Sequence, residues 1–160
     1  MNRIFVVTIF YTIPLLLIVH AFLLRPYRME TEAMAPTIAK GEWVILNHAR
    51  YGLWLGSWLL FSYDAPQRGD IVAFTLPQHN KEVFIERVVG IEGDTLIVRN
   101  GKLWVNNKLT PYAYSAWQNR RFFVPPHHLF VLGENLAHAV DSRLMGFLSL
   151  RQIRGKIIGY

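Results

Sequence analysis

The sequence predicts a mainly β domain over residues 25–160 that follows one N-terminal membrane-spanning helix over 4–24, and three observations indicate this fold class. Residues 4–24 are almost continuously apolar. The rest of the chain has short runs rich in β-branched residues, bounded by Gly, Pro, Asn and Asp. Asn100-Gly101 lies between two of these runs and is a strong hairpin signal. We therefore expect a strongly bent mixed β-sheet or barrel behind the helix.

The apolar run over 4–24 has the length of a membrane anchor. About twenty helical residues, at a rise of 1.5 Å each, cross the hydrocarbon core of a bilayer. A cleaved signal peptide is the competing interpretation, but its apolar core is normally only about 7–15 residues long. We expect a retained anchor. Basic residues flank both of its ends, so charge alone does not fix its orientation.

Seven short segments are predicted as strands because they are apolar and rich in β-branched residues. They are 43–46, 71–74, 83–85, 96–99, 103–105, 129–132 and 157–158. Asn100-Gly101 fits a type I′ turn, in which both central residues have positive φ. Asn106-Asn107 is predicted as a second turn. There are no repeats or long linkers, so the soluble part is predicted to be a single domain.

The segment 51–61 fits a soluble β domain poorly, because it has two Trp and four Leu and no charge. It is too short to span a bilayer. Burial in the core is one interpretation. The other is a loop that dips into the headgroup region, where Trp is favoured. In that interpretation Trp54, Trp58 and Phe61 contact the membrane.

Charge and cysteine content exclude several functions. The chain has no Cys, which excludes disulfides and thiol catalysis. Its formal net charge is +6, but the Lys and Arg residues form no run of five or more. Nucleic-acid binding favours clustered basic residues, so we expect contact with anionic lipid headgroups and no nucleic acid. The pair His127-His128 lacks a spaced third ligand, so no metal site or cofactor is expected.

Five sequence boxes occur in order behind the apolar run. They are Met29-Glu-Thr-Glu-Ala-Met-Ala-Pro-Thr37, Gly41-Glu-Trp-Val44, Arg68-Gly-Asp-Ile-Val-Ala-Phe74, Glu86-Arg-Val-Val-Gly-Ile-Glu-Gly-Asp94 with its hairpin, and Gly133-Glu-Asn135 with Asp141-Ser-Arg143. This series resembles the type I signal peptidases, the Ser/Lys-dyad family S26, over nearly the whole chain. Each box is weak alone, and the ordered series is specific.

The resemblance implies a catalytic Ser and a neutral Lys amine within hydrogen-bond reach, since a Ser hydroxyl needs a base and burial lowers the pKa of a Lys. The family's nucleophile position is Ala33 in this chain, and its general-base position is Glu86. The position of a Ser that binds the Lys is Ala139. All three functional groups are replaced. The fold-shaping residues of the same boxes remain, among them Met34, Pro36, Arg87, Asp141, Ser142 and Arg143.

This distribution of changes indicates a pseudoenzyme that kept its fold and lost its chemistry. A laboratory substitution of the nucleophile would explain Ala33 alone, and random divergence would also alter the structural Gly and Asp residues. The alternative is an active endopeptidase with Thr31 as substitute nucleophile. The resemblance gives Thr31 a simpler role, as an oxyanion donor. We expect Glu86 to pair with Arg143, and Glu32 and His138 to be solvated.

We therefore predict a single-pass protein of the cytoplasmic membrane with its globular part on the extracytoplasmic face. Its predicted function is non-catalytic: it binds signal-peptide-like or pilin-like segments, or assists an active signal peptidase or a secretion complex. In the family an extended substrate is held as an added β-strand, and such a groove depends on backbone groups that outlast the dyad. A third hypothesis is an interfacial structural subunit that binds no peptide.

Overall fold

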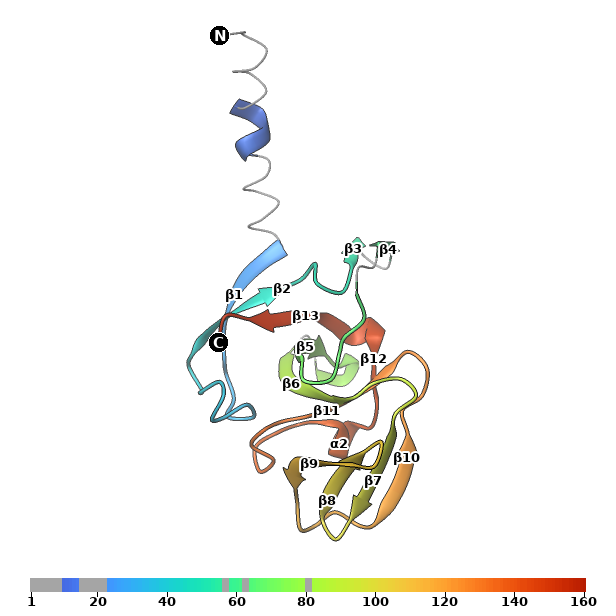
Figure 1. Ribbon diagram of the computed structural model, residues 1–160. Helices are drawn as coiled ribbons and strands as arrows, with labels where there is room; N and C mark the ends of the chain where they lie inside the picture. The colour runs from blue at the N-terminus through green and yellow to red at the C-terminus, as the bar shows by residue number, and fades with distance from the viewer. Residues whose placement is uncertain (1–9, 15–22, 56–57, 62–63, 80–81) are drawn as a thin grey trace.

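The computed structural model of the chain describes residues 10–14, 23–55, 58–61, 64–79 and 82–160. Residues 10–14 are helical and lie outside the β domain (Figure 1). Within the described ranges, no helix is both long and apolar enough to cross a membrane. Most of the predicted anchor over 4–24 lies outside the described residues, so the anchor stays a prediction.

A seven-stranded sheet forms the body of the domain, and all of its strand pairs are antiparallel. In spatial order its strands are β1 (Leu24–Arg28), β2 (Trp43–Asn47), β13 (Ile153–Ile158), β5 (Ile71–Thr75), β6 (Val83–Gly90), β11 (His128–Leu132) and β12 (Leu148–Ser149). The mainly β prediction is confirmed. The expectation of a mixed sheet is wrong, because every described pair of neighbouring strands in this sheet is antiparallel.

The seven-stranded sheet is strongly bent (Figure 1). Three strands separate β1 from β6, which in a flat sheet would place them roughly 19 Å apart. Yet the Tyr27 hydroxyl of β1 lies 3.4 Å from the carbonyl oxygen of Val83 on β6. One tyrosine side chain bridges the two strands, so the sheet curls until β1 faces β6.

A second, four-stranded sheet forms a separate lobe with the order β10 (Arg120–Phe123), β7 (Thr95–Arg99), β8 (Lys102–Val105) and β9 (Lys108–Ala113). The predicted hairpin between β7 and β8 is confirmed, with φ values of 48° at Asn100 and 71° at Gly101. The second predicted turn is also present, with positive φ at Asn106 and Asn107. Valines and leucines of β7 and β8 pack with Val89 and Phe130 of the first sheet and join the two lobes.

The remaining elements are short. The pair β3 (Leu53–Leu55) and β4 (Trp58–Phe61) is an antiparallel hairpin. Two 3₁₀ turns span Pro77–His79 and Leu150–Gln152, and the helix α2 spans Ser142–Met145. The side chains of Trp54, Trp58 and Phe61 lie outside the described part, so their contact with a membrane stays a prediction.

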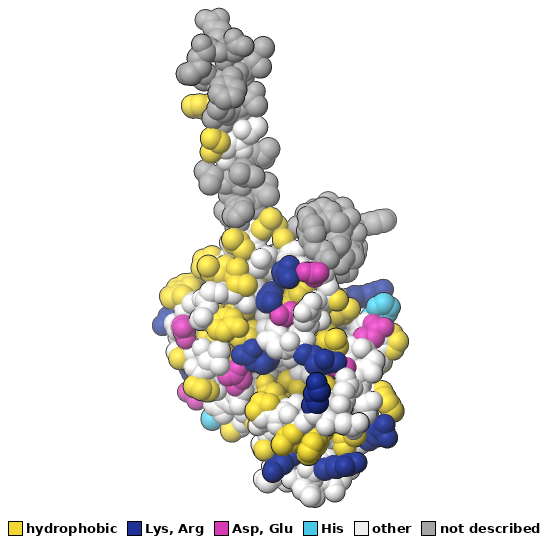
Figure 2. Space-filling model, viewed as in Figure 1, with side chains coloured by type: hydrophobic (Ala, Val, Ile, Leu, Met, Phe, Trp, Pro, Cys, Tyr) yellow, Lys and Arg dark blue, Asp and Glu magenta, His cyan; other side chains and the backbone are white. Residues whose placement is uncertain are grey.

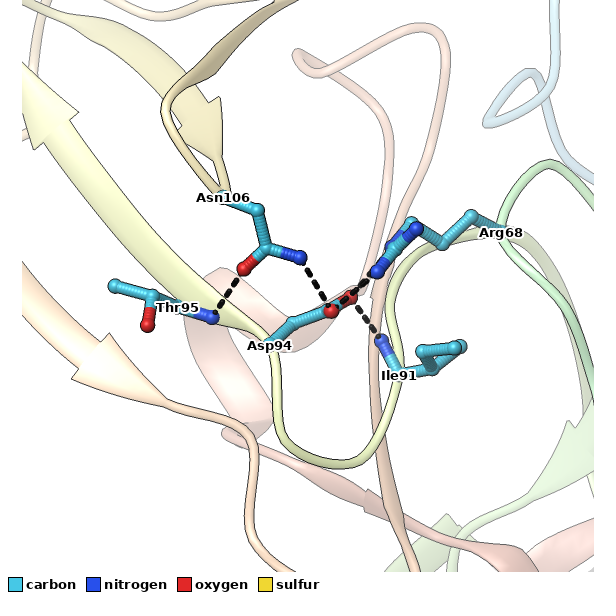
Figure 3. Close-up of polar contacts among 5 residues, drawn as sticks. All are labelled: Arg68, Ile91, Asp94, Thr95 and Asn106. Carbon is cyan, nitrogen blue, oxygen red and sulfur yellow. Dashed lines mark hydrogen bonds and ion pairs between the residues drawn. The ribbon is translucent and has the colours of Figure 1, made fainter.

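A buried carboxylate links the seven-stranded sheet to the start of β7 (Figure 3). Asp94 is 3% exposed. Its Oδ2 accepts hydrogen bonds from Arg68 Nε at 2.6 Å and from the Ile91 N–H at 2.9 Å, and its Oδ1 accepts one from Asn106 Nδ2 at 2.8 Å. Asn106 in turn accepts a hydrogen bond from the Thr95 N–H at 2.9 Å. These contacts hold the loop before β5 and the first strand of the lobe together.

All seven predicted strands are present, but six others were not predicted. Two of these, β1 and β9, contain Pro26 and Pro111. Both are edge strands of their sheets, where a proline that lacks an N–H is tolerated. The strand β10 begins with two arginines and also lies at an edge, so its sequence lacks the apolar alternation of a half-buried strand.

Candidate functional site

Three positions far apart in the sequence converge at Gly133, just after β11. A Cβ atom placed on Gly133 would lie 2.3 Å from Ala139 Cβ, 2.8 Å from Glu86 Oε2 and 2.9 Å from the Ala33 carbonyl oxygen. Only a residue without a side chain fits between them. The structure thus brings together the nucleophile, general-base and Lys-partner positions that the family resemblance assigns to Ala33, Glu86 and Ala139.

The side chains of Ala33 and Ala139 are methyl groups, and the Ala33 atom that lies nearest to Gly133 is its carbonyl oxygen. Ala33 lies in the turn that follows β1, where it is 4% exposed. Its carbonyl oxygen accepts a hydrogen bond from the Asn135 N–H at 2.8 Å, which ties this turn to the segment after Gly133. Its N–H donates to Thr31 Oγ1 at 3.4 Å. The hydroxyl of Thr31 therefore accepts from the backbone beside the site, and its side chain is exposed.

Glu86 is the ionisable group of this cluster. It lies in the middle of β6, is 1% exposed, and its Oε2 has no hydrogen-bond partner among the described residues. Burial, together with the negative charge of Asp141, raises the pKa of this carboxyl well above its ordinary value, and Arg143 opposes the shift. An unpaired carboxylate in such a place is unfavourable, so the neutral form is stabilised.

The expected pairing of Glu86 with Arg143 is wrong. Arg143 Nε donates to Asp141 Oδ1 at 2.8 Å, and its Nη2 donates to the carbonyl oxygen of Leu136 at 2.6 Å. Its guanidinium also lies 4.9 Å from the ring centroid of Tyr114. Asp141 is two residues away in sequence and fully buried, so the local pair forms in place of the pair across the site.

Asp141 and Ser142 organise the backbone around the site. Asp141 is the N-cap of α2, where its Oδ1 accepts from the Arg143 N–H at 3.0 Å. Its Oδ2 accepts from the Gly133 N–H at 3.1 Å. The Ser142 hydroxyl accepts from the Val131 N–H at 2.9 Å. Both side chains thus fix the end of β11 against α2, which places Gly133 and Ala139 where they meet Glu86.

Met34 lies in the apolar core, whereas Arg87 makes polar contacts. Met34 is fully buried in the core cluster that contains Ala33 and Ala139. Arg87 follows Glu86 on β6, so its side chain points to the other face of the sheet. There it binds Glu134, with 2.9 Å from Nε to Oε1, and donates from Nη1 to the carbonyl oxygen of Gly69 at 2.6 Å.

An open groove of about 650 Å³ lies on this Arg87 face, between β6 and β9. Its lining includes Pro36, Arg87, Tyr112 and Glu134. Glu86 does not line this groove. Pro36 is exposed at the groove, although the sequence indicated only a fold-shaping role for it.

Glu32 and His138 were expected to be solvated, which is confirmed, and the structure also brings them together. Both are exposed, and His138 Nε2 lies 4.0 Å from Glu32 Oε2. They flank Ala33 and Ala139 in sequence, so convergence of the two alanines also places their neighbours side by side. Their positions next to Ala33 and Ala139 in the sequence were therefore the signal that could have predicted this contact. Across the described residues, no three His, Asp or Glu side chains gather into a possible metal site.

One edge of β6 is open beside Glu86. Val88 exchanges backbone hydrogen bonds with Asp70 and Gly69 on the β5 side, at 2.8 Å each. Backbone groups alternate along an antiparallel strand, so those of Val83 and Ile85 face the opposite edge. On that edge β11 pairs with β6 only from Arg87 to Gly90. Among the described residues, no strand pairs with Val83 and Ile85 there, and only the Tyr27 hydroxyl reaches the Val83 carbonyl.

Comparisons with known proteins agree with this geometry. The chain is 30% identical to the signal peptidase I of Bacillus caldolyticus over 154 residues, covering 85% of this chain and 78% of that protein. It is 31% identical to thylakoidal processing peptidase 1 of Arabidopsis thaliana over 153 residues, covering 85% of this chain but only 41% of the relative.

A crystal structure of a signal peptidase I from Enterococcus faecalis superposes with a TM-score of 0.50 and 26% identity, covering 61% of this chain and all of that one. The family model described as signal peptidase, peptidase S26, matches residues 2–159 of this chain. That match takes in all five boxes and the converging positions at Gly133. The chain is therefore a member of the signal peptidase I family, peptidase family S26.

Proposed function

We propose that this chain is a non-catalytic member of its family that binds extended signal-peptide-like or pilin-like segments at the surface of the cytoplasmic membrane. The observation that carries the proposal is the convergence of Ala33, Glu86 and Ala139 at Gly133. Peptide-bond cleavage by this family's chemistry needs a hydroxyl or another nucleophile at the first of these positions. A methyl group has neither a lone pair nor a proton to give.

Glu86 does not supply the missing chemistry by itself. A raised pKa makes a carboxylate a better base near neutral pH. A base, however, acts on a proton within hydrogen-bond reach, and the groups that meet Glu86 Oε2 around Gly133 are the methyl group of Ala139 and the carbonyl oxygen of Ala33, neither of which is a proton donor. Among the described residues no hydrogen bond joins the exposed Thr31 hydroxyl to Glu86, and the hydroxyl accepts one from the Ala33 N–H instead.

The open edge of β6 supports the binding part of the proposal. Ile85 presents an N–H and a carbonyl to this edge, so an extended peptide there would gain main-chain hydrogen bonds without displacing a strand. Its alternate side chains would then lie over the buried apolar residues Met29, Ala33, Met34 and Ile85, which are at most 4% exposed. Small apolar side chains would suit such a surface. This mode of binding needs no catalytic residue.

A cleavage assay tests the non-catalytic part. The purified full-length protein, in detergent or liposomes, is incubated with a preprotein substrate, and we expect no product above the buffer blank. Turnover that is abolished by Thr31→Ala would replace this proposal with the substitute-nucleophile hypothesis.

A binding assay tests the peptide groove separately. The probe is a fluorescent signal peptide with Ala at the first and third positions before its cleavage point, and its anisotropy is followed on titration with the protein. We expect saturable binding. The same peptide N-methylated at alternate residues keeps its side chains but loses its main-chain donors, so its binding should be lost. Equal binding of both peptides would exclude strand addition at β6.

A further inference from the structure

The net charge of the chain is concentrated in one lobe. Residues 95–133 contain five Lys or Arg residues and no Asp or Glu, which gives this segment +5 of the chain's formal +6. The five residues are Arg99, Lys102, Lys108, Arg120 and Arg121. The segment includes all four strands of the second sheet. The rest of the protein is therefore nearly neutral, and the four-stranded lobe is strongly cationic.

None of these five basic residues forms an ion pair among the described residues, whereas two basic residues of the first sheet do. In the first sheet Arg87 binds Glu134 and Lys156 binds Asp70. Of the five in the lobe, all are exposed and none forms an ion pair within the described residues. Among the described residues no acidic side chain neutralises their charge, so it remains available to a binding partner.

Three of these arginines surround a hollow beside strand β10. Arg99, Arg120 and Arg121 line an open hollow of about 420 Å³. The guanidinium of Arg121 lies 5.3 Å from the ring centroid of Phe123, and Phe123 is 60% exposed. The lower part of Figure 2, over the four-stranded sheet, accordingly carries basic and apolar side chains. This surface offers positive charge next to an exposed aromatic ring.

Strand β10 also has an open backbone edge. It is the last strand of its sheet and pairs only with β7 among the described residues. The Val124 N–H donates to Asp94 on the β7 side, so by alternation Arg121 and Phe123 direct their backbone N–H and carbonyl groups outward. An open edge of this kind is a template for another extended chain.

We propose that this edge docks an acidic, extended segment of a partner protein, which adds to β10 as a further strand. Its main chain would bind Arg121 and Phe123. Its carboxylates would lie against Arg99 and Arg121 on one face of the sheet or against Arg120 on the other, because successive side chains of a strand point to opposite faces. A second copy of this chain is disfavoured, because it would bring the same positive charges together. The lobe lies at the end of the molecule opposite residues 10–14 (Figure 1), which disfavours the lipid surface that the N-terminal run would enter.

A charge-reversal titration tests this docking site. The probe is a fluorescent peptide of alternating Glu and Val, and the full-length protein is titrated into it in detergent. The variant is Arg120→Glu/Arg121→Glu. The matched control is Lys40→Glu/Arg151→Glu, which removes the same charge at exposed residues outside the lobe. We expect the affinity to fall about tenfold or more in the variant and about twofold or less in the control.

Two further probes make the outcome decisive. A Lys/Val peptide of the same length, and a Glu/Val peptide N-methylated at alternate residues, should both fail to bind. Equal losses in the variant and the control would overturn the proposal, as would full binding of the N-methylated peptide. Binding of vesicles containing phosphatidylglycerol, or of DNA, with the same dependence on Arg120 and Arg121 and without peptide binding would also overturn it. Retained circular dichroism of both variants shows that they are folded.

Discussion

Asp141 binds the guanidinium of Arg143 at 2.8 Å, and the buried carboxyl group of Glu86 has no ion pair among the described residues. The two acidic side chains are close enough for the charge of Asp141 to raise the pKa of Glu86 further. Among the described residues, Arg143 therefore forms an ion pair with Asp141 and none with Glu86. The chain tolerates this arrangement because a neutral Glu86 needs no counter-ion.

The first prediction concerns the pH dependence of stability. The pKa of Glu86 is raised in the folded state above an ordinary value near 4.5, so over the interval between them only the unfolded chain loses the proton. The free energy of unfolding should then fall as the pH rises through that interval. Glu86→Gln removes this titration, so the variant should gain stability relative to the wild type as the pH rises above the ordinary value near 4.5.

Urea denaturation at a series of pH values measures this difference. Glu30→Gln serves as the control, because Glu30 is exposed, and it should follow the wild type. A constant difference between wild type and Glu86→Gln at every pH would mean that Glu86 does not titrate abnormally.

The second prediction concerns the Asp141–Arg143 pair. Asp141→Ala removes the N-cap of α2, the acceptor for the Gly133 N–H and the partner of an almost buried guanidinium. We expect a loss of roughly 3–5 kcal/mol in the free energy of unfolding. Asp141→Ala/Arg143→Met should lose less than the single variant, because no uncompensated buried charge remains. A double variant that is less stable than Asp141→Ala would contradict this account.

The third prediction concerns Gly133. A methyl group at this position would overlap Ala139 Cβ and crowd both Glu86 and the Ala33 carbonyl. Gly133→Ala should therefore cost roughly 1–3 kcal/mol, the usual range for overpacking. Adding Ala139→Gly should recover part of the loss, because it removes the shortest contact. Thermal denaturation of the two variants checks this, and no recovery in the double variant would place Ala139 elsewhere.

The fourth prediction concerns Asp94, whose hydrogen bonds with Arg68, Ile91 and Asn106 lower its pKa although burial acts in the opposite direction. A lowered pKa means that the stabilisation is present above the ordinary value near 3.8 and is lost as the pH falls through the folded value. Asp94→Ala should lower the free energy of unfolding by roughly 2–4 kcal/mol at neutral pH. The difference in this free energy between variant and wild type should become smaller towards pH 3. A gap that is constant with pH would show that the loss is only one of packing.

Sequence patterns predicted much of the sheet but not its edges. Strands such as 71–74 and the turn at Asn100-Gly101 were predicted because burial on both faces and positive φ leave a local signature. The edge strands β1, β9 and β10 leave none, since Pro26, Pro111 and Arg121 are acceptable where one side of the strand meets solvent.

The site was only partly predictable for a different reason. The boxes in the sequence aligned Ala33, Glu86 and Ala139 with one family site, and the fold brings them together. The partner of Arg143 could not be read from the sequence. Asp141 and Glu86 are both acids within reach, and the N-cap geometry of α2 decides between them.

The last prediction concerns restoring the lost chemistry. A Ser/Lys dyad acts as a unit, so its members' effects on activity are not additive. Ala33→Ser alone should stay inactive, because Glu86 offers no neutral amine at the general-base position. Ala33→Ser/Glu86→Lys places a hydroxyl and an amine at converging positions, and burial would lower the pKa of the new Lys. Adding Ala139→Ser would give that amine a hydrogen-bond partner.

We expect the triple variant to be the one most able to cleave a preprotein, measured by gel shift of the mature product. The comparison is Ala33→Ser/Glu86→Gln, which has the hydroxyl but no amine and should remain inactive. The space around Gly133 limits this design. The Lys side chain is longer than that of Glu86, and it must fit where Glu86 Oε2 and Ala139 Cβ already lie close to Gly133. Activity in the single Ala33→Ser variant would show that the base lies elsewhere, and Glu32 and His138 at the rim of the site would then be the next residues to replace.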